Sequence, residues 1–134
     1  MTKLSKIEGI GSAYEAKLKA AKVGTVEGLL KMGASAKGRA GLESASGISQ
    51  KLILEWVNLA DLLRVKGVGG QYADLLEEAG VDTVAELAGR VPESLHKSMM
   101  EVNAQKNLVN RPPNVKMVKN WIAQAKKLRR VVEY

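Results

Sequence analysis

The 134-residue sequence has no cysteine and no phenylalanine, and it has only two tryptophans and three tyrosines. The absence of cysteine excludes disulfides and thiolate zinc sites. With so few aromatic residues, the core must be built from Leu, Val, Ile, Ala and Met. No apolar run approaches the ~20 residues that a membrane-spanning helix requires, and the first six residues lack the apolar core of a signal peptide. We therefore expect a cytoplasmic protein that has no membrane partner.

Catalytic sequence patterns are also missing. The single histidine, His96, has no partner acid, cysteine or second histidine beside it. There is no G-x-S-x-G, H-E-x-x-H or Walker pattern. The Gly67–Gly70 run is not a dinucleotide-binding turn, because no strand is predicted before it. We predict that the protein is not an enzyme and has no cofactor, no resident metal and no small-molecule substrate.

Negative charge is scarce relative to positive charge. Lys and Arg number 21 and Asp and Glu 14, which gives a net charge of +7 and an isoelectric point of about 9.7. A basic domain of this size is a candidate for nucleic-acid binding. The alternative from charge alone is a solvated lysine-rich surface that keeps the protein soluble.

A turn of the form apolar-x-Gly-apolar-Gly occurs twice, as Ile7–Gly11 and Val65–Gly69, with an offset of 58 positions. Further along, at an offset of 65, Trp56 matches Trp121. Because the only two tryptophans fall on matched positions, we predict a tandem duplication with one repeat in residues 1–64 and the other in residues 65–134. We also expect both tryptophans to lie in the core.

The apolar spacing predicts helices, and no stretch alternates with the period of a strand. We therefore predict an all-α fold of two four-helix units, packed as one compact body because no linker separates the repeats. Ser12, Thr25, Ser35 and Thr83 are the predicted N-caps. The predicted helices are Ser12–Ala21, Val26–Met32, Ala36–Ser44, Gln50–Leu63, Gly70–Ala79, Val84–Gly89, Pro92–Lys106 and Val115–Val131.

Each glycine turn precedes a helix, with Leu18 or Leu76 seven positions after the second glycine. This pattern resembles the helix-hairpin-helix motif of DNA repair enzymes, ligases and polymerases. The resemblance implies that the hairpin N–H groups hold a phosphate of the DNA backbone without reading sequence. It also implies that such a hairpin sometimes holds a monovalent cation through its backbone carbonyls. Ala73 matches a small residue of the motif, where the first copy has Glu15.

Each copy also contains a second, weaker hairpin, which in the first copy is residues 44–49, with Ser49 in place of the last glycine. Two hairpins joined by a helix resemble the double helix-hairpin-helix domain and the C-terminal domain of the RNA polymerase alpha subunit. Residues 7–129 as a whole resemble a bacterial domain-of-unknown-function family made of two such units.

The charged residues near each hairpin indicate which of the two copies is better suited to bind phosphate. The first hairpin has several lysines nearby, whereas the helix after the second hairpin carries more carboxylates. We therefore predict that the first hairpin binds phosphate and that the second hairpin serves packing or a protein contact. The last helix is basic, and Lys119, Lys126 and Arg130 are predicted to share one face. The helix macrodipole also favours cations at this end without any ligand.

The sequence thus predicts a non-catalytic module that binds double-stranded DNA through hairpin N–H groups and basic side chains. The alternative is a protein–protein adaptor or scaffold that uses the same helical repeats, which the carboxylate-rich second hairpin helix favours. The predicted nucleic-acid-binding residues are Lys6, Gly9, Ile10, Gly11, Ser12, Lys17, Gly47, Ser49, Lys51, Gly67, Gly69, Lys119, Lys126 and Arg130.

Overall fold

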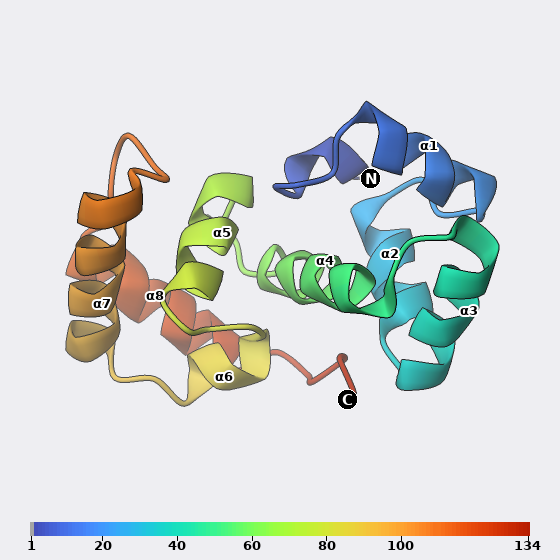
Figure 1. The fold of residues 1–134 in the computed structure, drawn as a ribbon. Coiled ribbons are helices and arrows are strands. Elements are labelled where there is room, and N and C mark those ends of the chain that lie inside the picture. The colour runs from blue at the N-terminus through green and yellow to red at the C-terminus, as the bar shows by residue number, and fades with distance from the viewer. Residues whose placement is uncertain (1) are drawn as a thin grey trace. The chain divides into compact units, whose positions relative to one another are not determined.

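The computed structural model describes residues 2–134, and over these residues the chain is helical with one isolated bridge between Lys3 and Thr25 (Figure 1). The predicted all-α class is confirmed. A 3-10 helix, η1, covers Leu4–Lys6. The α-helices are α1 (Ser12–Ala20), α2 (Val26–Gly33), α3 (Ala36–Ser46), α4 (Gln50–Leu62), α5 (Gly70–Glu78), α6 (Val84–Ala88), α7 (Pro92–Lys106) and α8 (Val115–Ala125).

The contacts divide the chain into two compact units. The first comprises Met1–Asp61 together with Val131–Tyr134, and the second comprises Leu62–Arg130. The last residues of the sequence therefore fold with the first unit. The repeat boundary after residue 64 and the packing of both repeats as one body stay predictions.

Side-chain caps fix the start of several helices. Thr25 and Ser35 each accept a hydrogen bond at 3.0 Å from the backbone N–H three residues on, and Thr83 does so at 3.4 Å. These three predicted caps are confirmed. The prediction for Ser12 is wrong, because Gly11 is the N-cap and Ser12 is the first residue of α1.

The last helix is shorter than predicted. It ends at Ala125 rather than near Val131. Lys127 and Leu128 then donate to carbonyls three residues back, at 3.0 and 3.2 Å, which marks a tighter turn. The following Val131–Tyr134 belong to the first unit. The other helix boundaries lie within two residues of the predicted ones.

This early end corrects the prediction of one long basic helix. Of the predicted basic residues, Lys116 and Lys119 lie in α8. Lys126 is its C-cap and Arg130 follows in non-helical chain. Lys119, Lys126 and Arg130 therefore do not share a helix face.

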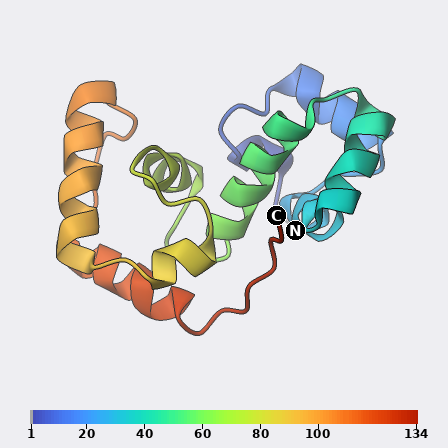
Figure 2. The same cartoon turned by 60° about the horizontal axis from the view of Figure 1, so that its bottom comes forward.

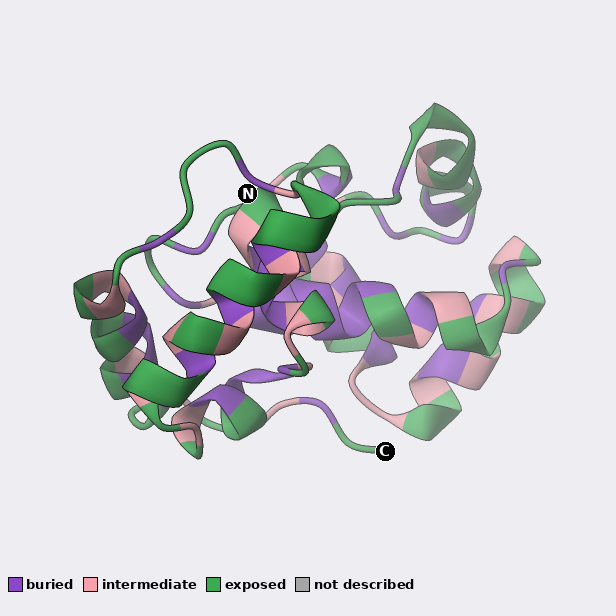
Figure 3. Cartoon of the chain, turned by 60° about the vertical axis from the view of Figure 1, so that its left-hand side comes forward, coloured by how far each residue is buried: buried purple, intermediate pink, exposed green. Residues whose placement is uncertain are grey.

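The two tryptophans lie in the core, as predicted. Trp56 is 1% exposed and Trp121 is 2% exposed. Each packs against a tyrosine: the ring centroids of Tyr14 and Trp56 are 5.0 Å apart, and those of Tyr72 and Trp121 are 5.2 Å apart. Figure 3 colours the chain by burial and shows that the helices have buried faces and exposed faces. Among the described residues, no helix is both long enough and apolar enough to cross a membrane.

Candidate nucleic-acid interface

The two Gly-apolar-Gly turns have the same backbone conformation. Gly9 and Gly67 both have φ of +95°, a value that L side chains rarely adopt. The apolar residue between the glycines is buried in each turn, with Ile10 6% and Val68 5% exposed. The Ile10 N–H donates to the Ile7 carbonyl at 3.2 Å and so helps to shape the turn. Because the Ile10 side chain is buried, it is not available to a ligand.

Each turn lies directly over its unit's tryptophan. A Cβ atom on Gly9 would lie 3.3 Å from Trp56 Nε1, and one on Gly67 would lie 3.2 Å from Trp121 Nε1. Glycine is therefore required at both positions for its backbone conformation and also for close approach to the indole ring.

The helices after these turns begin without a side-chain cap. Gly11 caps α1 and Gly69 caps α5, both in extended conformation, and neither can offer a side-chain acceptor. The first-turn N–H groups of an α-helix have no partner inside the helix. At α1 and α5 these groups therefore carry the positive end of the helix dipole and suit an anion.

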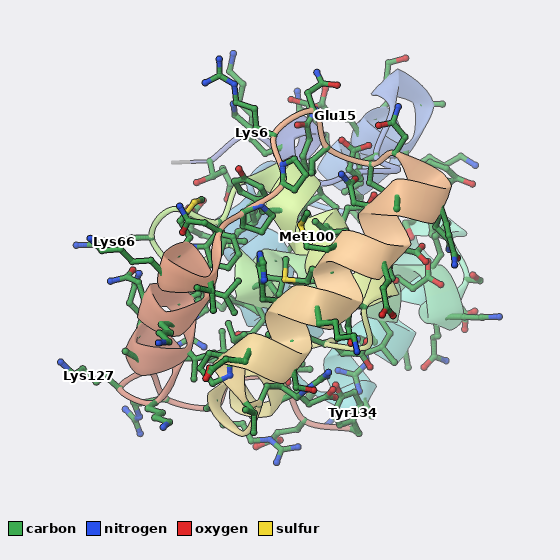
Figure 4. The ribbon with its side chains drawn as sticks, turned by 90° about the vertical axis from the view of Figure 1, so that its left-hand side faces the viewer. Lys6, Glu15, Lys66, Met100, Lys127 and Tyr134 are labelled. Atoms are coloured by element: carbon green, nitrogen blue, oxygen red, sulfur yellow. The ribbon has the colours of Figure 1, made fainter. Side chains whose placement is uncertain are left out.

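The second turn opens onto two hollows. A hollow of about 480 Å³ is lined by Gly67, Gly69, Gly70, Gln71, Tyr72, Val109, Asn110 and Arg111. A neighbouring hollow of about 360 Å³ is lined by Lys66, Gly67, Asn114, Lys116, Met117, Asn120 and Trp121. Neither lining includes an acidic residue. Lys66, whose side chain extends away from the ribbon in Figure 4, contributes positive charge together with Arg111 and Lys116.

A glutamine holds the backbone of the second turn. Gln124 Oε1 accepts the Lys66 N–H at 2.9 Å, and Gln124 Nε2 donates to the Lys66 carbonyl at 2.9 Å. Gln124 Nε2 also donates to Asn120 Oδ1 at 2.8 Å, which orients the carboxamide. At the 65-residue offset, the first unit has Leu59 at this position. Gln124 was not among the predicted residues, and the signal in the sequence is that the matched residue of the first repeat is the apolar Leu59.

Side chains also fix the loop after α7, where the chain turns back toward α8 (Figure 2). Asn103 exchanges two hydrogen bonds with the backbone of Val109, at 2.9 and 3.1 Å. Tyr72 donates its hydroxyl to the Arg111 carbonyl at 2.8 Å, and His96 Nε2 lies 2.9 Å from the Pro113 carbonyl. The Arg111 backbone is thus held in place at the rim of the larger hollow, while Arg111 itself is exposed.

Cations near the first turn have partners of their own. Lys17 Nζ lies 5.8 Å from the centre of the Tyr14 ring. Lys19 pairs with Glu15 at 3.8 Å. Lys6, in η1, is exposed. The first turn therefore has lysines nearby, but part of their charge is directed to the unit's own groups.

Two carboxylates of α5 lie away from its N-terminus, whereas Asp74 lies about one turn after it. Glu78 is the last residue of this nine-residue helix and forms an ion pair with Lys106. With a rise of about 1.5 Å per residue, Glu77 and Glu78 lie roughly 10 Å along the axis from the first turn. Glu77 and Glu78 therefore lie away from the second hairpin, as their places near the end of the predicted helix Gly70–Ala79 imply.

At the weaker hairpin of the first unit, side chains of the protein already accept hydrogen bonds from N–H groups at the start of α4. Gly47 is the left-handed C-cap of α3, with φ of +76°. Ser49 Oγ accepts the Leu52 N–H at 3.3 Å, and a carboxylate oxygen of Glu43 accepts the Gln50 N–H at 3.2 Å. Lys51 is exposed beside them. An anion at this helix start would meet the Glu43 carboxylate.

Over the described residues the protein is all-helical, and each of its two units has a glycine hairpin followed by a helix without a side-chain cap. Within the described residues, no group of His, Asp or Glu is arranged to hold a metal ion. The chain belongs to the family described as Domain of unknown function (DUF4332), whose family model matches residues 8–128. Comparisons with curated proteins and with solved structures gave no match.

Proposed function

We propose that this protein is a non-catalytic module that binds the backbone of double-stranded DNA with little preference for sequence. The observation that carries the proposal is the second hairpin, where the uncapped start of α5 opens onto hollows lined by Lys66, Arg111 and Lys116 and by no carboxylate. The matched backbone of both hairpins supports two helix-hairpin-helix-type units that arose by duplication.

The second hairpin is the stronger contact in this proposal, which reverses the ranking from sequence. Its cations line the hollows beside the helix start, whereas Lys17 and Lys19 of the first unit contact Tyr14 and Glu15. The first hairpin then contributes a weaker phosphate contact through Lys6, Lys17 and the start of α1.

The chemistry of the interface accounts for the lack of sequence preference. Backbone N–H groups and Lys or Arg side chains bind phosphate oxygens, which are the same at every base pair. Affinity should therefore depend on salt, and log K should fall with log[salt] by about 0.9 per phosphate neutralised.

A charge-reversal experiment tests the site. Fluorescence anisotropy would measure binding of a labelled mixed-sequence duplex to the native chain, to Lys66→Glu and Arg111→Glu, and to the control Lys97→Glu. Lys97 is exposed on α7 and gives the same change in net charge as the Lys66 substitution. We expect the two hairpin variants to lose about tenfold in affinity and to bind with a shallower salt slope, with a smaller loss for the control.

Equal losses in all three variants would show that only total charge matters and would contradict the assignment to the second hairpin. No binding by the native chain at about 50 mM salt would contradict the nucleic-acid proposal altogether. The adaptor alternative would then be favoured, and a pull-down that retains its partners after nuclease treatment would support it.

The first hairpin is tested separately. Lys6→Glu with Lys17→Glu should weaken duplex binding less than Lys66→Glu with Arg111→Glu, which makes the same change in net charge. Lys37→Glu, at an exposed position of α3, is the control in the first unit. A larger loss from the Lys6 and Lys17 pair would restore the ranking predicted from sequence.

A further inference from the structure

The segment Val131–Tyr134, here called the return segment, binds to the first unit through the main chain of one residue. The Glu133 N–H donates to the Ala34 carbonyl at 2.7 Å. Arg39 Nη2 donates to the Glu133 carbonyl at 2.7 Å. Glu133 itself is exposed, so these two bonds place no demand on its side chain.

The flanking residues add side-chain contacts. Val132 is 1% exposed and is part of the core of the first unit. The Tyr134 hydroxyl lies 3.5 Å from Asn58 Oδ1, at the long limit of a hydrogen bond. The first unit thus binds a non-helical segment with a buried aliphatic residue, then a residue held by its backbone, then a tyrosine. Main-chain bonds with pockets for alternate side chains are a recurrent mode of peptide recognition.

Arg39 is held in place by the first unit itself. It is 4% exposed, and its Nη1 donates to the carbonyls of Gly33 and Ala34 at 2.8 and 3.1 Å. These carbonyls lie at the C-terminal end of α2, where the helix dipole favours a cation. The bonds of Arg39 to Gly33 and Ala34 are made within the first unit and help to position the donor and the acceptor that Glu133 meets.

We propose that the site formed by Ala34, Arg39 and Asn58 is a docking site that the return segment of a second copy of the chain can occupy by exchange. The segment follows the non-helical and largely exposed residues 126–130. Its contacts with Ala34, Arg39 and Asn58 are the same whether it comes from the same chain or from another. Exchange of an identical element between protomers is a low-cost route to a dimer.

The absence of cysteine allows a direct test of exchange. A chain carrying Ala34→Cys is mixed with a chain carrying Glu133→Cys, oxidised and run on a non-reducing gel. The control mixes Ala34→Cys with Glu101→Cys, at an exposed position of α7. Docking raises the local concentration of the two thiols, so we expect at least about fivefold more cross-linked heterodimer than in the control. Equal yields would overturn the proposal.

Hydrogen exchange on the unmodified chain covers the case in which a cysteine variant does not fold. If the return segment detaches on its own, the Glu133 amide should exchange at least about tenfold faster than the Leu42 amide in α3. Equal exchange rates would show that the segment leaves only on unfolding of the unit and would also overturn the proposal. Neither measurement involves nucleic acid, so the outcome is independent of the proposed DNA binding.

Discussion

Replacing Gln124 with leucine should loosen the second hairpin and destabilise the second unit. Leucine is the residue that the first repeat carries at the matched position, Leu59, so the helix tolerates it in a similar setting. The substitution removes both hydrogen bonds to the Lys66 backbone, each 2.9 Å long, and the bond to Asn120. It leaves the charge of the protein unchanged.

The magnitude follows from these bonds. A neutral hydrogen bond contributes about 0.5–1.5 kcal/mol net. Because Lys66 is exposed, water can replace the lost partners of its N–H and carbonyl, which keeps the loss in the lower half of the range. We therefore expect the free energy of unfolding to fall by about 1–2 kcal/mol. With a urea dependence of about 1 kcal/mol per M, the midpoint should fall by about 1–2 M.

The assay is urea unfolding followed by Trp121 fluorescence in a Trp56→Phe background. Exchange of the Lys66 amide is measured in parallel and should become faster. Gln105→Leu, at an exposed position of α7, makes the same chemical change away from the hairpin and should leave both signals unchanged. An unchanged midpoint together with unchanged Lys66 exchange in Gln124→Leu would refute the role assigned to the carboxamide.

Three further predictions concern stability. Arg39→Ala should cost the first unit about 3 kcal/mol, because three carbonyl bonds to a buried cation are lost, and a urea titration followed by Trp56 fluorescence should show it. Gly67→Ala should destabilise the protein by more than about 1 kcal/mol. Gly41→Ala, at an open position inside α3, should stabilise it by about 0.5–1 kcal/mol. Thermal melts in which both variants change stability in the same direction would contradict this. Hydrogen bonds from the Thr2 hydroxyl and backbone N–H lower the pKa of Glu27 from 4.5 to about 2. Because the pKa is depressed on folding, the stabilisation is full above 4.5 and is lost as the pH falls through about 2. The difference in melting temperature between the native chain and Glu27→Gln should therefore shrink over that window.

Local features were predictable from the sequence. The caps at Thr25, Ser35 and Thr83 depend on residues three positions apart, and the helical spacing depends on one or two turns. The burial of Trp56 and Trp121 followed from their matched places on apolar helix faces. Ser12 was assigned wrongly because a capping side chain was expected where the turn instead uses Gly11 in extended conformation.

Charge near the hairpins could not be ranked from the sequence. Residues 66, 111 and 116 line the same region because the loop after α7 is held by Asn103, His96 and Tyr72, contacts that join residues up to 39 positions apart. Glu77 and Glu78 lie at the far end of α5, and Asp74 lies in its middle.

The sequence by itself determined the all-helical class, most helix boundaries and the need for glycine in the two hairpins, because these depend on local backbone preferences and on apolar spacing. Tertiary structure alone decided that residues 133 and 134 bind to the first unit, since the bonds that join them to Ala34, Arg39 and Asn58 span the greater part of the chain. It also brings Arg111 and Lys116 to the hollows beside the second hairpin, which Lys66 lines as well. Both outcomes depend on contacts between residues far apart in sequence, and no local pattern records such contacts.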